Sequence, residues 1–254
     1  MVHILFQRME HPGTATAARI DAAPPTIEPP YPPVEPPVAS ATFPDPRALR
    51  GTEVVAISRT LSPGLVLAAY RLGIFPWPVS QGVVPWVAPE QRAIFSLADE
   101  PRWPRSLRKT LRRGEFDVTF DRAFGSVIHG CGTARDGATW ITPDVVRTYE
   151  TLHRLGWAHS VEVWDRTDER ELVGGLYGLA IGSAFAGESM FHTRTDASKV
   201  AFVALVDRLR ERGFALLDAQ VPTEHLMSLG CVAVERADFM ARLEAARGQS
   251  ARFR

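Results

Sequence analysis

Prolines are concentrated at the start of this 254-residue chain. Eleven of its 20 prolines lie in the first fifty residues, several of them as pairs between Pro24 and Pro37. Proline lacks a backbone N–H and fixes φ, so such a segment favours extended polyproline geometry and offers little apolar surface to bury. We therefore expect residues 1–45 to form a disordered tail, either a solvated extension or a ligand for a proline-recognition domain, with ordered structure beginning near Phe43.

The composition of the whole chain is that of a globular protein. Hydrophobic residues make up 45%, and 29 basic residues balance 29 acidic ones, so attraction to phosphate has to come from a local patch. The two cysteines, Cys131 and Cys231, form no CxxC pair, and the seven histidines show no metal-ligand spacing. We therefore expect no disulfide framework, no metal and no cofactor. The longest apolar run, Val200–Val206, is far too short to span a membrane, which favours a soluble cytoplasmic protein.

Helix and strand signals divide the folded part in two. Ser62-Pro63 has the residue types of a helix start, and Gly73 is suited to end that helix. The stiff, aromatic run Ile74–Pro78 cannot continue it. We place a domain boundary near residue 100 and expect a small N-terminal α/β domain over 46–100, a larger domain over 101–245 and a C-terminal tail over 246–254.

Helices and strands alternate in the larger domain. The expected elements are a helix from Thr142 to Leu155, a strand at Ser160–Trp164, a hairpin or bent strand at Leu172–Phe185, a helix at Ala197–Arg212 capped by Asp196, a strand at Phe214–Val221 and a short helix capped by Thr223. This alternation predicts an α+β fold whose larger domain has a mixed, mainly antiparallel sheet of the N-acetyltransferase (GNAT-like) type.

Two polar residues interrupt the apolar strand Phe214–Val221. Side chains alternate across a strand, so Asp218 and Gln220 are expected on one face, roughly 7 Å apart. A buried carboxylate and amide are costly unless they are paired. The pair is therefore either catalytic or a structural acceptor for a nearby loop, and local physics leaves these two interpretations open.

The segment Gly187-Glu188-Ser189-Met190-Phe191 places a glutamate after an apolar run. Met190 and Phe191 are side chains that line apolar ligand pockets, and Gly187 would let a ligand approach the backbone. On these five residues alone, a strand end with a solvated glutamate is the simpler interpretation.

A basic run follows the expected domain boundary. Six cations and no acid lie between Arg102 and Arg113. The cations at Arg105, Arg108, Lys109 and Arg112 share one helical face, with Ser106 as a candidate cap. Because no acid is interleaved, this stripe favours a phosphate backbone over an ordinary solvated face.

Other chemistry has little support in the sequence. There is no P-loop and no GxGxxG motif, and Cys131 has no histidine at a spacing that indicates a nucleophile. The segment Thr195–Lys199 stands where an acetyl-coenzyme A site would be, and Asp196 would repel a pyrophosphate there. An acyl donor other than a coenzyme A thioester is therefore expected.

These segments together resemble the leucyl/phenylalanyl-tRNA–protein transferase family. The matching stretches run in the family's order over about residues 60–240: Ala68–Arg71 to Gly73–Trp77, Ser106–Lys109, Thr139–Thr142, Leu152–Gly156, Ala158–Trp164, Leu172–Gly178, Gly187–Phe191, Ala197–Lys199, Leu217–Val221 and His225–Gly230. No single stretch is specific, but the ordered set is.

The resemblance implies a two-domain aminoacyltransferase that uses neither metal nor coenzyme A. Such an enzyme moves leucine, or less readily phenylalanine or methionine, from aminoacyl-tRNA to the N-terminal amine of proteins that begin with arginine or lysine. The product enters N-end-rule degradation. The alternatives are an N-acyltransferase of the same fold with another donor and a non-catalytic RNA-binding protein.

The resemblance also implies roles for individual residues. Asp218 and Gln220 would be the catalytic pair, with Glu188 beside them, and the basic stripe would bind tRNA. The aminoacyl and adenosine groups would lie among Trp77, Trp140, Phe185, Gly187, Ser189 and Met190. Asp218 would polarise the Gln220 amide, whose oxygen accepts a hydrogen bond from the attacking amine.

Three stretches depart from the family pattern. A Gly-Gly-Asp turn is replaced by Ile57–Thr60, a Trp-Trp-Ser-Pro/Asp-Pro-Arg stretch by Pro85–Arg92, and a Ser-Arg pair by His192-Thr193. Two of these departures lie in the expected N-terminal domain, whose substrate contacts are therefore expected to differ from the family's.

Overall fold

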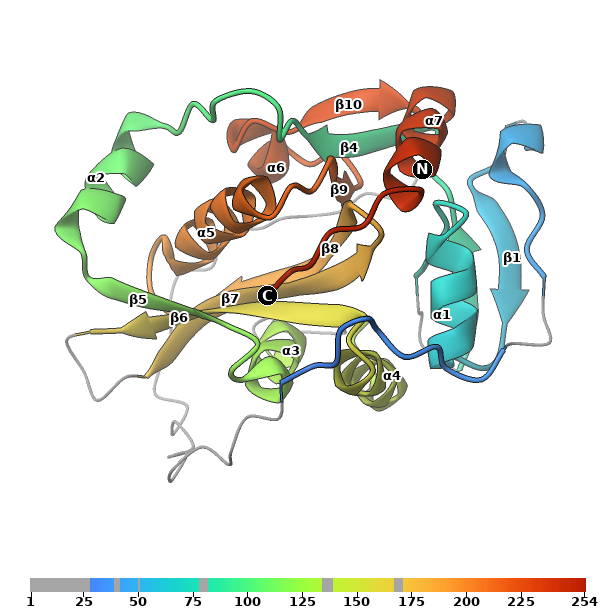
Figure 1. Ribbon diagram of the computed structural model, residues 1–254, viewed down its shortest axis with the longest axis horizontal. Coiled ribbons are helices and arrows are strands. Elements are labelled where there is room, and N and C mark those ends of the chain that lie inside the picture. The colour runs from blue at the N-terminus through green and yellow to red at the C-terminus, as the bar shows by residue number, and fades with distance from the viewer. Residues whose placement is uncertain (1–27, 39–41, 50, 78–81, 134–138, 167–170) are drawn as a thin grey trace.

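The computed structural model describes residues 28–38, 42–49, 51–77, 82–133, 139–166 and 171–254, and within them the chain forms two sheets (Figure 1). The smaller sheet has the strand order β1-β3-β2, and the larger has the order β10-β4-β9-β8-β7-β6-β5. The α+β class with a small N-terminal sheet and a larger mixed sheet, predicted from the sequence, is confirmed.

The small sheet packs beside a short apolar helix. Its elements are β1 (Val54–Ser58), β2 (Phe75–Pro76), β3 (Val84–Val87) and helix α1 (Pro63–Tyr70), preceded by the 3-10 turn η1 (Pro46–Ala48). The α1 helix begins as predicted, because the Leu65 N–H donates to Ser62 Oγ at 3.3 Å. Gly73 follows the helix with a φ of +71°. A Cβ there would lie 2.8 Å from the sulfur of Met240, so close packing also requires glycine.

The large sheet is antiparallel except for one central pair. Its strands are β4 (Gln91–Phe95), β5 (Phe116–Phe120), β6 (Ala158–Asp165), β7 (Leu172–Ile181), β8 (Ala184–His192), β9 (Leu216–Gln220) and β10 (Val232–Glu235). Only β8 and β9 run parallel. The predicted hairpin is therefore β7 and β8. Strand β4 lies in the expected N-terminal segment, yet it pairs with β9 and β10.

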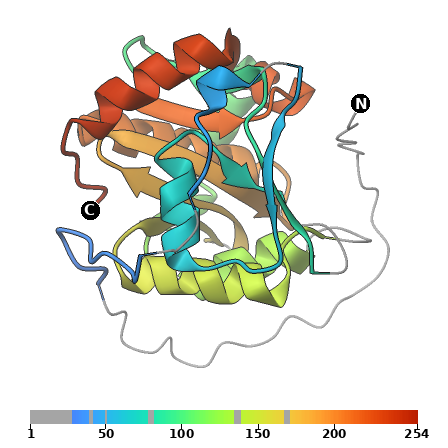
Figure 2. The ribbon, with the colours of Figure 1, turned by 90° about the vertical axis from the view of Figure 1, so that its right-hand side faces the viewer.

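Helices cover both faces of the large sheet (Figures 1 and 2). They are α2 (Arg105–Arg113), α3 (Phe124–Thr133), α4 (Pro143–Arg154), α5 (Ala197–Glu211), α6 (Glu224–Ser228) and α7 (Arg236–Arg247). Helix α5 packs on one face, and α3, α4 and α7 pack on the other. Neighbouring strand residues show this, because Leu216 belongs to the α7 core and Leu217 to the α5 core. Within the described ranges, no helix has both the length and the apolar character needed to cross a membrane.

Helix caps show which local predictions succeed. The side chains of Thr142 and Thr223 accept hydrogen bonds from the third residue of α4 and α6, as predicted. Asp196 precedes α5 but does not cap it, because its backbone is left-handed and its carboxylate binds Thr110 and Lys199. Ser106 lies inside α2 and caps nothing, since that helix begins after Pro104 without a side-chain cap.

Two segments expected to be tails contact the folded body. Residues 1–27 lie outside the described residues, but the Val34 N–H donates to Leu155 O at 2.8 Å and Trp157 Nε1 donates to Val34 O at 2.8 Å. In the expected C-terminal tail, Phe253 is 2% exposed and stacks on Phe185 at 5.4 Å between ring centroids. The N-terminal segment is thus held through the backbone of Val34, and the C-terminal segment through the buried ring of Phe253.

Candidate active site

The parallel strands β8 and β9 separate at the centre of the large sheet. Their pairing covers Ala184–Ala186 and stops at Asp218. Gly187 stands at the separation, where an added Cβ would meet only Asp218 O, at an ordinary 3.6 Å. Gly178 differs, because a Cβ there would lie 2.3 Å from a backbone oxygen. Protein packing therefore explains Gly178 but not Gly187, which leaves room for a ligand at the separation of the strands.

A β-bulge directs Glu188 at this point. Tyr177 pairs with Ser189 and Gly178 pairs with Gly187, so Glu188 is an extra residue in β8 without a partner on β7. Bulges re-aim side chains and are frequent beside active sites. The glutamate is only partly buried, so a substrate can reach it.

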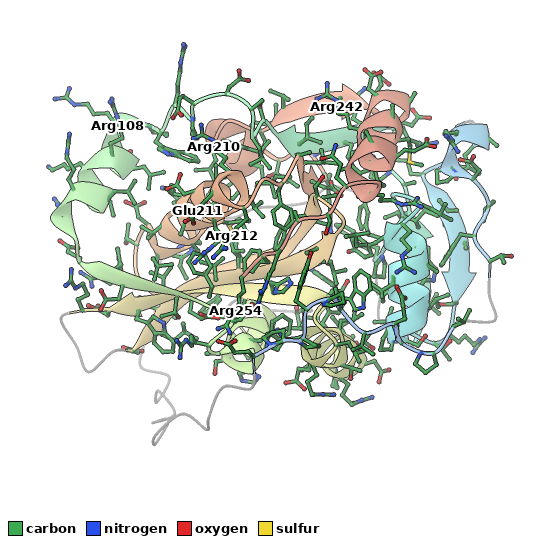
Figure 3. All side chains as sticks on the ribbon, in the orientation of Figure 1. Arg108, Arg210, Glu211, Arg212, Arg242 and Arg254 are labelled. Carbon is green, nitrogen blue, oxygen red and sulfur yellow. The ribbon has the colours of Figure 1, made fainter. Side chains whose placement is uncertain are left out.

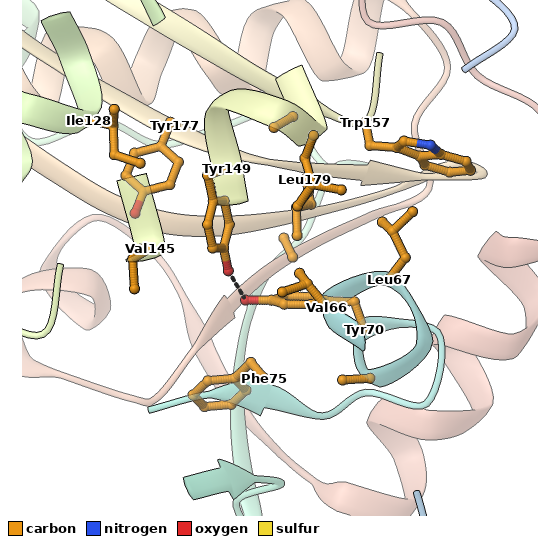
Figure 4. Packing of buried hydrophobic residues seen from close by; sticks show 14 of the residues in the cluster. Val66, Leu67, Tyr70, Phe75, Ile128, Val145, Tyr149, Trp157, Tyr177 and Leu179 are labelled. Carbon is orange, nitrogen blue, oxygen red and sulfur yellow. Dashed lines mark hydrogen bonds between the residues drawn. The ribbon is translucent and has the colours of Figure 1, made fainter. Parts of the chain in front are cut away.

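Two tyrosines and one amide surround the Glu188 carboxylate. Tyr70 from α1 donates a short hydrogen bond to Oε1, and Tyr149 from α4 donates to Oε2 at 3.1 Å. The two tyrosine oxygens are 3.3 Å apart, as the dashed line in Figure 4 shows. Gln220 Nε2 donates to Oε1 at 3.3 Å. Helix α1 beside the small sheet and helix α4 on the large sheet therefore each contribute a tyrosine to the same carboxylate.

The surroundings of Glu188 place its titration near neutrality. Desolvation by the surrounding protein raises its pKa to about 7, aided by the negative charge of Asp218 and opposed by the hydrogen bonds from Tyr70, Tyr149 and Gln220. Burial and the Glu188 charge also raise the pKa of both tyrosines well above the usual range. The tyrosines thus stay protonated and donate, while the glutamate exchanges a proton at physiological pH.

Gln220 leaves the regular strand geometry. Its φ is +63°, a left-handed conformation that is rare for residues other than glycine. Its Nε2 reaches Glu188 and also Tyr70, at 3.3 Å each. The side chains of Asp218 and Gln220 therefore bind different partners.

Asp218 is buried and ion-paired. It is 4% exposed and accepts from Arg92 Nε at 2.8 Å and from Arg92 Nη2 at 2.6 Å. Its Oδ1 also accepts from the backbone N–H of Gln220 at 2.8 Å. The bond that joins Asp218 to Gln220 thus runs to the backbone and not to the side-chain amide, which the expected polarisation would require.

The structure divides the apolar residues expected around the substrate into two groups. Trp77 and Trp140 pack, partly buried, against the core on the α4 side of the sheet. Phe185 and Met190 belong to the core on the α5 side. Ser189 is partly buried opposite Tyr177. The four apolar side chains therefore do not form a single pocket, although β8 carries two of them next to Gly187.

The predicted basic stripe forms the outer face of α2. Arg105, Arg108, Lys109 and Arg112 are all exposed, while Leu107 is buried on the opposite side. Arg108 points away from the protein at the end of the molecule that lies opposite α1 (Figures 1 and 3). None of these four cations is ion-paired with a carboxylate in the part of the chain that the structure describes. Their charge is available to a polyanion.

Sequence reasoning did not single out three residues at this site. Tyr70 lies on an apolar helix face, where its hydroxyl requires a buried partner, and this was the one available signal. Arg92 entered only as the end of the divergent stretch Pro85–Arg92, and Tyr149 gave no signal, because the partners of both are distant in the sequence. Among the residues with defined placement, no group of three or more His, Cys, Asp or Glu side chains is arranged to hold a metal ion.

Family models match most of the folded part. The model described as leucyl/phenylalanyl-tRNA protein transferase covers residues 94–244, and the model of that family's N-terminal domain covers 59–90. A leucyl/phenylalanyl-tRNA–protein transferase of Stutzerimonas stutzeri is 50% identical over 75% of this chain and 83% of its own length. A transferase of the same name from Solidesulfovibrio magneticus is 47% identical over 81% of this chain and 83% of its own length.

The solved structures are far less similar. The structure of L-PGS from Bacillus licheniformis reaches a TM-score of 0.41 at 11% identity, over 63% of this chain and 65% of that chain, and supports no inference here. The sequence relatives and both family models agree with the resemblance drawn from the ordered motifs. This chain belongs to the leucyl/phenylalanyl-tRNA–protein transferase family.

Proposed function

We propose that this enzyme moves leucine, and less readily phenylalanine or methionine, from aminoacyl-tRNA to the N-terminal amine of proteins that begin with arginine or lysine. Addition of the new residue would direct the acceptor to N-end-rule degradation. The observation that carries the proposal is the Glu188 carboxylate, held by two tyrosines and Gln220 where the central strands separate. Family membership supports the transferase class.

The chemistry needs few catalytic groups. The ester of an aminoacyl-tRNA is already activated, so no serine or cysteine nucleophile is required. An α-amino group has a pKa of about 7.7–8.0, so part of it is neutral and nucleophilic near pH 7.5. The protein then has to align amine and ester and move one proton, and alignment alone lowers the barrier by several kcal/mol.

Gln220 is suited to orient the attacking amine. Its Nε2 donates to Glu188 and Tyr70, so its amide oxygen is directed away from them. That oxygen can accept a hydrogen bond from the amine while the nitrogen lone pair attacks the ester carbon. An amide is too weak a base to remove the proton, so its role is orientation.

Glu188 is the group that can bind an ammonium or carry a proton. Attack forms the new C–N bond, and the departing ribose oxygen takes up the proton that the amine loses. A carboxyl with a pKa of about 7 can relay that proton at neutral pH. In its ionised form it accepts hydrogen bonds only, and so also suits the α-ammonium group of either substrate.

The two groups of apolar residues suit the two ends of the acyl donor. Phe185 and Met190, on the α5 side of β8, would line the pocket for the leucyl side chain, with Gly187 and Ser189 beside the ester. Trp77 and Trp140 would stack on the terminal adenosine, a contact typical of unpaired bases. The exposed cations of α2 would hold the phosphates of the tRNA stem.

A transfer assay tests this function directly. Purified protein is incubated with radiolabelled leucyl-tRNA and peptides that differ only in their first residue: arginine, lysine or glutamate. We expect label on the first two peptides and not on the third. Transfer from leucyl-coenzyme A in place of leucyl-tRNA would identify an N-acyltransferase with another donor. Tight tRNA binding without transfer would identify an RNA-binding protein.

A further inference from the structure

Arg92 is buried in a site that the proposed chemistry does not use. It is 1% exposed, although arginine is almost never fully buried unless it is paired. Its guanidinium lies between the rings of Phe75 and Phe239, 4.5 Å and 4.4 Å from their centroids. Its Nη1 donates to Gly73 O at 3.1 Å. Two rings and a carbonyl therefore fix the plane of the guanidinium.

That plane determines the position of Asp218. Arg92 donates to both carboxylate oxygens, Nε to Oδ1 and Nη2 to Oδ2, and such two-point pairing fixes orientation as well as charge. With its plane fixed, Asp218 Oδ1 also accepts the N–H of Gln220 at 2.8 Å. Asp218 thus transmits the position of the guanidinium to the backbone of Gln220.

Gln220 needs such support because its backbone is unusual. Its φ of +63° is unfavourable for a residue with a Cβ and persists only when the surroundings over-determine it. The pairing of β4 with β9 is also irregular here, since Ala93 pairs with Gln220 while Ile94 pairs with Asp218. The ladder alone therefore does not fix Gln220, and the bond to Asp218 supplies the missing constraint.

We propose that Arg92 is a positioning residue which, through Asp218, holds Gln220 in the left-handed conformation that presents its amide to Glu188 and Tyr70. The inference rests on the proposed orienting role of Gln220. Arg92 touches no substrate in this scheme. It links the start of β4 and the turn after α1 to the strand end that carries the chemistry.

A double-mutant cycle on turnover separates positioning from plain stability. Arg92→Met is compared with Gln220→Ala and with the double variant, using saturating leucyl-tRNA and an arginine-initiated peptide. We expect Arg92→Met to lower kcat by about 10²-fold, as misplacement of a reacting group does. In the Gln220→Ala background the same change should lower kcat by less than about 3-fold, because the group that Arg92 positions is gone.

Removing Arg92 alone leaves the Asp218 carboxylate buried and unpaired, which can unfold the protein. A second variant without that charge therefore separates a loss of positioning from a loss of folding. Arg92→Met/Asp218→Asn removes both charges and retains an oxygen that can accept the Gln220 N–H. We expect it to fold and still to lose kcat by about 10-fold, because the fixed two-point pairing is absent. Arg92→Lys should retain intermediate turnover, since lysine keeps the charge without the planar fork.

Arg236 offers a matched arginine without a link to Gln220. It donates to the backbone carbonyls of Pro46, Thr52 and Pro89, and so also joins helix α7 to the N-terminal segment that precedes β4. Arg236→Met should lower the melting temperature and leave kcat unchanged. If the folded Arg92→Met/Asp218→Asn variant keeps wild-type kcat while Gln220→Ala is inactive, the positioning role is wrong. If Gln220→Ala itself is fully active, the proposed function of Gln220 fails and the inference fails with it.

Discussion

Arg92 and Arg108 show the same side chain in opposite surroundings. Arg92 is 1% exposed, stacked between two rings and bound to Asp218 at two points. Arg108 is exposed on α2 without a carboxylate partner in the described part of the chain. A buried pair is little screened by salt and fixes geometry, whereas an exposed cation acts through a field that salt weakens. The difference separates a region suited to chemistry from a region suited to affinity.

The buried region should show the largest effect. Gln220→Ala removes the amide that would orient the amine, and we expect kcat to fall by about 10²-fold or more, as for loss of one well-placed hydrogen-bonding group. The melting temperature should change little, because Nε2 makes two long hydrogen bonds of 3.3 Å. Single-turnover transfer with saturating leucyl-tRNA measures the effect. A folded variant with wild-type kcat would remove Gln220 from the mechanism.

Glu188 should couple stability to pH. Its pKa is about 7 in the folded protein and 4.5 as the ordinary value, so the folded state holds a proton that the unfolded state has lost between these pH values. Stability should therefore fall as pH rises from 4.5 to 7, by up to about 3 kcal/mol. Glu188→Gln cannot titrate, so its free energy of unfolding should rise relative to that of the wild type as the pH increases from 4.5 to 7. Urea unfolding at pH 4.5, 6 and 8 measures this difference in the free energy of unfolding. Parallel pH dependences of the wild type and Glu188→Gln would contradict the coupling.

Tyr149 should set the pH at which transfer begins. Its hydrogen bond lowers the pKa of Glu188, so Tyr149→Phe should raise that pKa above about 7. If the ionised carboxylate is the active form, the acidic limb of the rate profile should move to higher pH by about 0.5–1 unit. Tyr177 is the matched control, because its buried hydroxyl has no hydrogen-bond partner among the described residues. Tyr177→Phe should leave the profile in place, and equal shifts in both variants would show a general packing effect.

The exposed region should show a smaller, salt-dependent effect. Arg108→Ala/Lys109→Ala should weaken leucyl-tRNA binding and reduce the log–log salt slope by about 0.7–0.9 for each lost phosphate contact. Arg212→Ala/Arg242→Ala removes the same charge from exposed positions outside α2 and should leave the slope unchanged. Filter binding between 50 and 200 mM salt distinguishes the two double variants, because each lost phosphate contact changes the salt slope by a fixed amount. An unchanged slope in the α2 variant would make the stripe an ordinary solvated face.

Local features of this fold were predictable, and long-range features were not. Ser62, Thr142 and Thr223 cap helices because each side chain accepts a hydrogen bond from a backbone N–H only three residues later. Asp196 has the residue type of a cap but does not cap α5, because its carboxylate accepts a hydrogen bond from Thr110, which is 86 positions away.

The same limit explains the candidate site. The sequence indicated Glu188 and Gln220 as polar interruptions of apolar strands, which is a local signal. The bulge at Glu188 and the left-handed Gln220 depend on neighbouring strands, and the Arg92–Asp218 pair joins residues 126 positions apart. No pattern within one segment carries that information.

The separation of chemistry from affinity can be measured with two donors. Leucyl-adenosine carries the ester and the terminal base but lacks the tRNA stem, so it needs the Glu188 region and not α2. We predict that Gln220→Ala loses kcat/KM equally on leucyl-tRNA and leucyl-adenosine. The Arg108→Ala/Lys109→Ala variant should lose kcat/KM on leucyl-tRNA and keep the wild-type value on leucyl-adenosine. Equal losses on both donors for the α2 variant would contradict the division of labour between the two regions.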